Sequence, residues 1–260
     1  MLSIFSWFGY REIAGAECLR LIRAAGFEGV LLWWDTIDGV DYRDMPALAR
    51  RAGLFIENVH TNFDMIQHIW EDSAAGQALF EHYLQCVDDC AAYEIPAMVV
   101  HAHTRGVPLP ADTRLGFERF RRIVDRAERL GVNVAMENQR SAAQMALAAR
   151  LLEGIDSPRF GFCLDSGHHN AREVPEVDML GRFGHRLMAL HLHDNIGKDD
   201  LHLLPFDGTV DWPAQMRKIA ETGYAGPTTL EVMNIGYEDK TPEEYLALAV
   251  ERAKRLEQLL

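Results

Sequence analysis

Several apolar segments of the chain end in a carboxylate, a histidine or both, and this repetition is the clearest sign of chemistry in the sequence. The segment ends read Glu57-Asn58-Val59-His60, His101-Ala102-His103, Glu137-Asn138, Asp165-Ser166-Gly167-His168, His191-Leu192-His193-Asp194 and Glu231. Buried carboxylates and imidazoles are costly unless they are paired or bind a metal. Mixed oxygen and nitrogen ligands without a candidate cysteine suit Mn²⁺, Mg²⁺, Co²⁺ or Zn²⁺ and argue against a structural zinc site. We therefore expect a centre that holds one divalent metal.

Short β-rich runs alternate with amphipathic stretches along the whole chain, and no low-complexity linker interrupts them. Eight strands are expected near Leu2–Trp7, Gly29–Trp34, Leu54–His60, Ala97–His101, Val132–Asn138, Arg159–Asp165, Leu187–His193 and Thr228–Met233. The clearest helices are expected at Ser73–Tyr93, Thr113–Leu130, Ser141–Leu152, Asp211–Thr222 and Pro242–Leu259. Repeated strand and helix units of this kind indicate an α/β fold with a parallel sheet.

Helix boundary signals support this alternation. Ser141, Asp211 and Thr241 are good N-caps, and four glycines follow helices as stops: Gly26, Gly53, Gly131 and Gly223. Eight such units can close as a barrel or open as a doubly wound sheet, and no GxGxxG motif follows the first strand. We therefore predict a single (β/α)₈ barrel domain over residues 1–260, whose reactive side chains lie at the C-terminal strand ends.

Composition narrows the classes of partner. The 260 residues suit one barrel, and 26 Lys and Arg against 39 Asp and Glu give a formal charge of -13. This charge disfavours nucleic acid and anionic membranes as partners. The first residues lack a basic start and a cleavage site, and the four cysteines lack a CxxC pair. We expect a cytoplasmic protein with reduced, structural cysteines, for which homo-oligomerisation stays open.

The order and spacing of these motifs resemble the xylose isomerase-like TIM barrel superfamily, which includes sugar isomerases and epimerases, inosose dehydratases, hydroxypyruvate isomerases and the AP endonuclease family 2 enzyme endonuclease IV. The motifs include Asp200-Leu201-His202, and the resemblance covers essentially the whole chain. It implies a metal quartet of Glu137, Asp165, His191 and Glu231, with His168 contacting substrate. Only the family's spacing selects His191 over His193, which has the same strand parity. The residues two positions before the quartet are small or medium-sized and should face the barrel interior: Ala135, Cys163, Ala189 and Thr229.

Further polar and aromatic residues near the strand ends are candidates for the pocket. His60, His101, Asp200 and His202 match positions at which endonuclease IV holds two more zinc ions, although pocket polarity and substrate hydrogen bonding explain them more simply. Aromatic walls pack on the apolar face of sugar rings, and loop cations hold anions. We therefore expect substrate contacts from Trp7, Trp33, Trp34, Phe63, His103, His193 and Arg105.

The resulting functional hypothesis is a metal-dependent isomerase or epimerase of a small sugar, ketose or polyhydroxy carbonyl compound. A metal-stabilised enediolate would form, Glu137 and Glu231 would transfer the proton, and His168 would orient an oxygen. An inosose-type dehydratase could use the same enediolate. An abasic-site nuclease is disfavoured by the negative charge, and a catalytically silent barrel by the retained carboxylates. The exact substrate, its phosphorylation and the native metal stay open.

Overall fold

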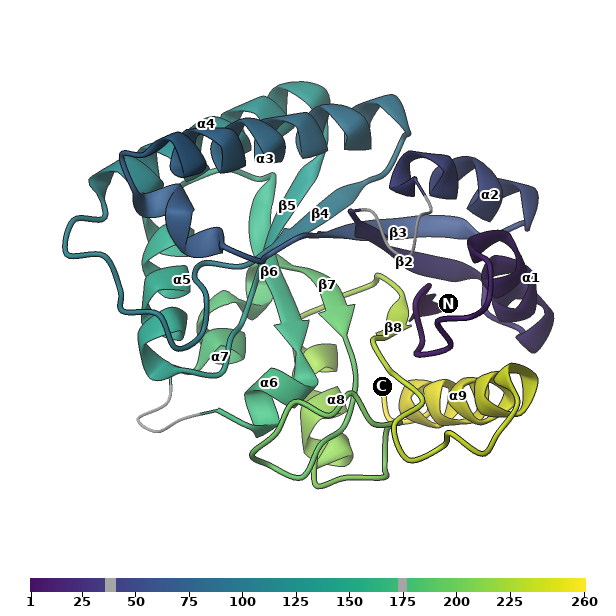
Figure 1. The fold of residues 1–260 in the computed structure, drawn as a ribbon. Coiled ribbons are helices and arrows are strands. Elements are labelled where there is room, and N and C mark those ends of the chain that lie inside the picture. The colour runs from purple at the N-terminus through teal and green to yellow at the C-terminus, as the bar shows by residue number, and fades with distance from the viewer. Residues whose placement is uncertain (36–40, 173–176) are drawn as a thin grey trace.

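Within residues 1–35, 41–172 and 177–260, which the computed structural model describes, eight parallel strands form a nearly closed barrel (Figure 1). The strand order β7-β6-β5-β4-β3-β2-β1-β8 follows the chain, and a parallel bridge between Leu192 and Leu230 joins the two edges. The strands are β1 Leu2–Phe5, β2 Gly29–Trp34, β3 Phe55–Thr61, β4 Ala97–Val100, β5 Asn133–Glu137, β6 Phe160–Asp165, β7 Leu187–His191 and β8 Thr228–Leu230. The predicted (β/α)₈ barrel is confirmed.

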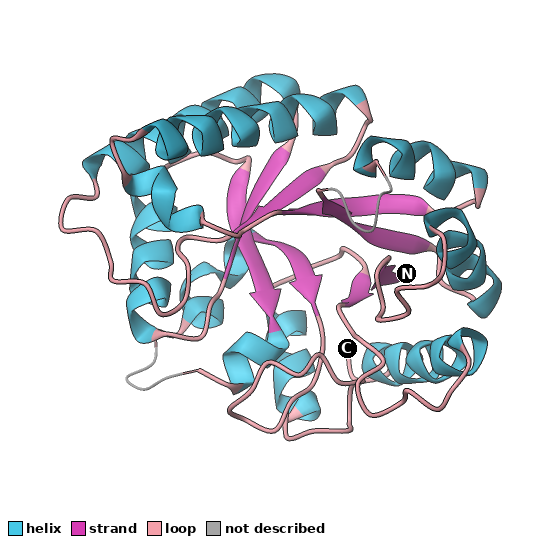
Figure 2. Ribbon diagram, viewed as in Figure 1, coloured by secondary structure: helices cyan, strands magenta, loops and turns pink. Residues whose placement is uncertain are grey.

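Helices surround the strands on the outside of the barrel (Figure 2). They are α1 Gly15–Ala25, α2 Met45–Arg51, α3 Ala74–Ala92, α4 Arg114–Leu130, α5 Ala142–Gly154, α6 Ser166–Asn170, α7 Met179–Phe183, α8 Trp212–Glu221 and α9 Pro242–Glu257. Short 3₁₀ turns lie at η1 Tyr42–Asp44, η2 Ile66–Trp70 and η3 Gly184–Arg186. No helix in the described part of the chain is long and apolar enough to cross a membrane.

The predicted helix caps and glycine stops are confirmed. Ser141 and Thr241 each form a capping box, and the Asp211 side chain accepts a hydrogen bond from the backbone of Ala214. Gly26, Gly53, Gly131 and Gly223 all have positive φ angles. Left-handed glycines at these positions turn the chain from each outer helix into the next strand.

Several predicted strands extend too far at their C-terminal ends. The strand predicted to reach Trp7 ends at Phe5, and the strand predicted to reach His193 ends at His191. The apolar pattern continues past the last paired residue, because the chain stays buried there while it turns into the pocket loops. The backbone remains hydrogen-bonded, for example from Leu192 N to Thr229 O at 2.9 Å.

The barrel encloses a small inner core that is separate from the main core between sheet and helices. Val99, Ala135, Cys163 and Ala189 form this inner cluster, and each is fully buried. The predicted inward orientation of Ala135, Cys163 and Ala189 is therefore confirmed. Small side chains in this layer let the larger carboxylates and imidazoles of the strand ends converge above it.

Glu57 is an unusual buried carboxyl group inside the barrel. It is the extra residue of a β-bulge, because Val30 pairs with Ile56 while Leu31 pairs with Asn58. The Thr229 hydroxyl donates a hydrogen bond to Glu57 Oε2, and only 7% of Glu57 is exposed. Burial raises the pKa of Glu57 to about 8, and the hydrogen bond from Thr229 limits the rise. The side chain is therefore mostly neutral near pH 7.

We predict that Glu57→Gln becomes more stable relative to the native protein as the pH rises. Folded Glu57 holds its proton up to about pH 8, whereas the unfolded chain releases it near 4.5, so native stability falls between these values. Glutamine mimics the neutral acid and lacks this loss, which amounts to about 5 kcal/mol at most. Urea unfolding of both proteins at pH 5 and pH 9 measures the difference. An equal stability gap at both pH values would show that Glu57 is charged throughout.

Candidate metal centre and substrate pocket

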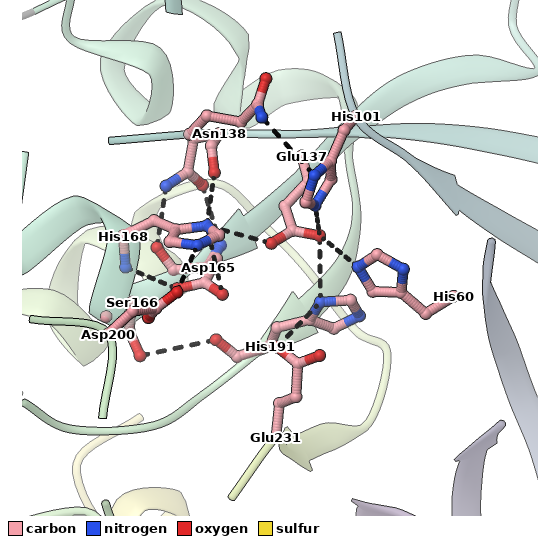
Figure 3. A network of polar contacts seen from close by, with 12 residues as sticks. His60, His101, Glu137, Asn138, Asp165, Ser166, His168, His191, Asp200 and Glu231 are labelled. Carbon is pink, nitrogen blue, oxygen red and sulfur yellow. Dashed lines mark hydrogen bonds and ion pairs between the residues drawn. The ribbon is translucent and has the colours of Figure 1, made fainter. Parts of the chain in front are cut away.

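Glu137 lies at the end of β5 and is surrounded by four imidazoles (Figure 3). Its Oε2 lies 3.0 Å from His60 Nε2, 3.3 Å from His101 Nε2 and 3.3 Å from His191 Nδ1. Its Oε1 lies 3.2 Å from His168 Nδ1, and only 1% of the residue is exposed. These rings come from β3, β7 and the segments that follow β4 and β6, so one carboxylate joins four parts of the barrel.

The predicted quartet comes together at this point. Ligand atoms of Glu137, Asp165, His191 and Glu231 all lie within 4.8 Å of one another. Neither ring nitrogen of fully buried His191 makes a hydrogen bond of good geometry with the described residues, although Nδ1 lies 3.3 Å from Glu137 Oε2. A buried imidazole without such a hydrogen bond, next to three carboxylates, is the donor set that a divalent cation satisfies. The residues present therefore fit a divalent metal.

The electrostatics of the quartet agree with this fit. Burial raises the pKa of Glu137, but His101 and His191 outweigh burial and hold it well below its ordinary value. Burial and the neighbouring charges of Glu137 and Asp165 raise the pKa of Glu231 well above its ordinary value. Buried carboxylates that repel one another are stabilised by a cation between them, so protein groups alone leave this cluster electrostatically incomplete.

Two further histidines have the tautomer that metal-binding histidines use. His60 Nδ1 lies 2.9 Å from the Thr61 carbonyl oxygen, and His202 Nδ1 lies 2.8 Å from the Glu231 carbonyl oxygen. Each carbonyl oxygen requires an N–H on Nδ1, so Nε2 is the ring nitrogen that faces the centre. Ligand atoms also lie within 4.8 Å of one another in two more groups: His60, Glu137 and His191, and His193, Asp200 and His202.

Hydrogen bonds to the backbone hold the ends of β5, β6 and β7 in register. Asn138 Nδ2 donates to Asp165 O at 2.9 Å, and Asn138 Oδ1 accepts from Asp165 N at 2.8 Å. Ser166 Oγ donates to His193 O at 2.7 Å and accepts from His193 N at 2.9 Å. A Cβ on Gly167 would lie 1.9 Å from His193 Cε1, so only glycine fits there. The sequence Asp165-Ser166-Gly167-His168 thus positions two histidines and one carboxylate together.

The loop that carries Asp200 and His202 folds around the fully buried carboxylate of Asp194. Asp194 Oδ1 accepts hydrogen bonds from the backbone of Asn195 and Val210. Asp194 Oδ2 accepts from Phe206 N at 3.0 Å and Trp212 Nε1 at 2.8 Å. His202 has a φ of 48° and Phe206 a φ of 75°, so this loop contains two non-glycine residues in a strained backbone region.

A cavity of about 640 Å³ opens above the centre, at the C-terminal ends of the strands. Trp33 stacks on His60 with ring centres 5.5 Å apart, and Phe63 stacks on His101 at 4.4 Å. These aromatic contacts form one wall, whereas the carboxylates lie at the base. The predicted residues that line the cavity are Trp7, Trp33, His60, Phe63, His101, His103, Arg105, Glu137, His168, Asp200, His202 and Glu231.

The structure does not bring two of the predicted substrate contacts, Trp34 and His193, to the cavity. Trp34 faces the helices, because neighbouring strand residues point to opposite sides and Trp33 faces the cavity. Its Nε1 donates to Asp89 Oδ2 at 3.3 Å, and the residue is fully buried. His193 is also fully buried and does not line the cavity. Its Nε2 lies 3.0 Å from Asp165 Oδ1, so it supports that carboxylate instead.

Sequence reasoning missed several residues that the structure brings to the site. Asn138 and Asp194 were noted only within motifs, although their place directly after strand ends could have suggested a positioning role. Arg11 and Arg140 line the cavity and lie outside the predicted set, although both lie in loops that follow predicted strands. Their loop positions at the C-terminal end of the barrel were the available signal.

Comparison with known sequences places most of the chain in one protein family. Residues 19–256 match the family described as xylose isomerase-like TIM barrel. An uncharacterised protein of Sinorhizobium fredii, y4fM, is 34% identical over 191 residues, which are 68% of this chain and 58% of that relative. Fructoselysine 3-epimerase of Shigella flexneri is 27% identical over 146 residues, 54% of this chain and 51% of that enzyme. The match thus spans less than two thirds of the length of either relative.

The fold also matches a solved structure that contains a metal. The IOLI protein with a bound zinc atom superposes with a TM-score of 0.79 at 15% identity, covering 98% of this chain and 97% of that one. At this identity the likeness concerns the fold, and it is the fold that places strand-end residues around one point.

We predict that Asp194→Asn weakens the loop after β7. The new amide group cannot accept a hydrogen bond, so two of the four donors that face Asp194 lose their partner. Unsatisfied buried donors cost about 1–3 kcal/mol each, and urea unfolding measures the loss. Asp211→Asn is the matched control, because exposed Asp211 caps α8 and asparagine caps helices equally well. Equal stability of the two variants would contradict the role assigned to Asp194.

Proposed function

The chain belongs to the xylose isomerase-like TIM barrel family, and from this premise we propose that it is a metal-dependent isomerase or epimerase of a small polyhydroxy carbonyl compound. One observation carries the proposal: Glu137 and Glu231 line the same cavity beside a buried imidazole that makes no hydrogen bond of good geometry with the described residues. The 3-epimerase from Shigella flexneri and the zinc-containing IOLI structure support this reaction class and a metal. We propose Glu137, Asp165, His191 and Glu231 as the residues that hold the metal.

The proposed chemistry is proton transfer next to a carbonyl group. A divalent metal supplies Lewis acidity that lowers the cost of removing a proton from the neighbouring carbon. Glu137 or Glu231 takes this proton and leaves an enediolate of the substrate. The other carboxylate returns a proton to the opposite face of that carbon or to the adjacent carbon, which gives an epimer or an isomer. His168, between Glu137 and Asp200, orients a substrate oxygen by hydrogen bonding.

We predict that the protein exchanges a carbon-bound proton of its substrate with solvent. Ketoses, inososes and hydroxypyruvate would be incubated in D₂O with the Mn²⁺-loaded protein. After the paramagnetic Mn²⁺ is removed, NMR spectra of the compounds would show deuterium incorporation. Glu137→Gln and Glu231→Gln should each slow exchange by about 10²–10⁴-fold, because each removes a proton-transferring group. Asp64→Asn is the control, since this exposed carboxylate lines the same cavity outside the quartet. Unchanged exchange in both glutamine variants would exclude this mechanism.

Loss of water from the substrate would identify the dehydratase alternative, because the same enediolate can expel a β-hydroxyl group instead of being reprotonated. Deuterium exchange occurs in either case. The identity of the product, rather than the exchange, therefore separates dehydration from epimerisation and isomerisation.

We further predict about one metal ion per chain. Asp165→Asn should lose this ion, because the amide is a weak ligand, yet asparagine still caps α6 as Asp165 does through His168 N at 2.7 Å. Mass spectrometric metal analysis of protein purified without chelator measures the stoichiometry, with Asp64→Asn as the control. Protein that binds no metal even after metal addition would contradict the proposed cofactor.

A second candidate function is hydrolysis of a phosphate ester by a cluster of two or three zinc ions. The tautomers of His60 and His202 favour it, because each ring directs Nε2 to the centre near Glu137 or Asp200. The formal charge of -13 disfavours a polyanionic substrate such as DNA. Two or three zinc ions per chain in the same metal analysis would support this candidate over the isomerase.

A further inference from the structure

The upper wall of the cavity carries more positive charge than the composition of the chain suggests. Arg11, Arg105 and Arg140 line the cavity, whereas Asp64 is the one carboxylate of its described lining outside the metal centre and Asp200. The chain as a whole has 26 basic and 39 acidic residues. None of the three arginines forms an ion pair within 4.0 Å among the described residues. Their guanidinium groups are therefore available to an anion in the cavity.

Arg11 has a different environment from the other two arginines. Its guanidinium carbon lies 5.2 Å from the ring centre of Trp7, so it belongs to the aromatic wall. Arg105 and Arg140 come from the neighbouring loops after β4 and β5. Arg140 Nη1 donates to the Lys198 carbonyl oxygen at 3.4 Å, which joins its loop to the loop after β7.

A buried amide frame fixes the two loops that carry Arg105 and Arg140. Gln139 Oε1 accepts from His103 N at 3.2 Å, and Gln139 Nε2 donates to His103 O at 2.6 Å. Gln144 Nε2 donates to the same carbonyl oxygen at 2.8 Å. All three residues are buried. These hydrogen bonds hold His103 and Gln139 together. His103 lies two residues before Arg105 and Gln139 one residue before Arg140, so both loops are fixed on the side of the cavity that carries Glu137.

We propose that Arg105 and Arg140 form an anion subsite, and that the substrate is a polyhydroxy carbonyl compound with a phosphate or carboxylate group away from its reacting carbons. The proposal rests on the proposed function for the reacting end. Arg105 and Arg140 line the same cavity from adjacent loops, and each guanidinium group offers a planar fork of N–H donors that suits two oxygens of such an anion. A cavity of about 640 Å³ has room for a small sugar and this additional group.

Equilibrium binding tests the subsite without requiring turnover. Titration calorimetry of the Mn²⁺-loaded protein would compare D-fructose with D-fructose 6-phosphate and with D-fructuronate, which carries a carboxylate. We expect at least one of the two anionic ketoses to bind 10-fold or more tightly than fructose at low salt. The preference should shrink with added salt, because the arginines are accessible to solvent. The tighter of the two probes identifies a phosphate or a carboxylate as the preferred group.

Substitutions then assign the preference to the two arginines. The double variant Arg105→Ala/Arg140→Ala should lose 10-fold or more of the affinity for the anionic ketose and keep its affinity for fructose. Arg105→Lys/Arg140→Lys should give an intermediate loss, because lysine keeps the charge without the two-pronged geometry. Arg129→Ala/Arg217→Ala, at exposed positions of α4 and α8, removes the same number of charges away from the cavity and should bind like the native protein.

Three results would overturn the subsite. They are equal affinity for neutral and anionic ketoses, a preference that survives in the double alanine variant, and no measurable binding of either anionic ketose at millimolar concentration. Deuterium exchange into fructose together with any of these results would leave the proposed function intact. Arginine-dependent binding without exchange into any probe would instead support the subsite and contradict the proposed function.

Discussion

The structure depends on the burial of one carboxylate, Glu137, among four imidazoles. Removing a charged group from water is costly unless nearby groups of opposite charge or a cation compensate for the loss. Here the compensation comes from β3, β7 and the segments after β4 and β6, so the barrel must be closed and correctly paired before the centre exists. The positions of Asp165 and Glu231 follow from the same closure. A site of this kind is stable only as part of the complete barrel.

The surrounding residues keep the centre in place mainly through backbone hydrogen bonds. Asn138 joins β5 to β6, and Ser166 joins β6 to the segment after β7. The Asp194 carboxylate accepts hydrogen bonds from four N–H groups and so fixes the loop that brings His202 to the cavity. Such supports matter because a shift of about 1 Å in a catalytic group can cost about 10²-fold in rate. The polar residues beside the proposed ligands are therefore as much a part of the site as the ligands.

Apolar periodicity and glycine stops are local signals, and they allowed the barrel and its strand ends to be predicted. Many of the polar residues that line the cavity were implied by the resemblance to a known family. Trp34 lies away from the cavity because two adjacent strand residues point to opposite sides, and the sequence does not state which of the two tryptophans faces inward. His193 has the inward parity that was expected, but its ring lies below the cavity against Asp165. The bulge at Glu57 depends on pairing with β2. Such non-local pairing leaves no local signature.

The proposed metal quartet alone would not determine which reaction occurs, because isomerisation, epimerisation and dehydration all begin with the same proton removal. The outcome depends on which carbon faces Glu137 or Glu231 and on which face it presents. A substrate held only at its reacting end can rotate about that point, whereas a second contact at Arg105 and Arg140 would fix its direction along the cavity. Orientation of this kind lowers the barrier of the reaction whose atoms are aligned and leaves the others slow. On this proposal, the specificity of the barrel lies in the loops after β4 and β5 rather than in the proposed metal ligands.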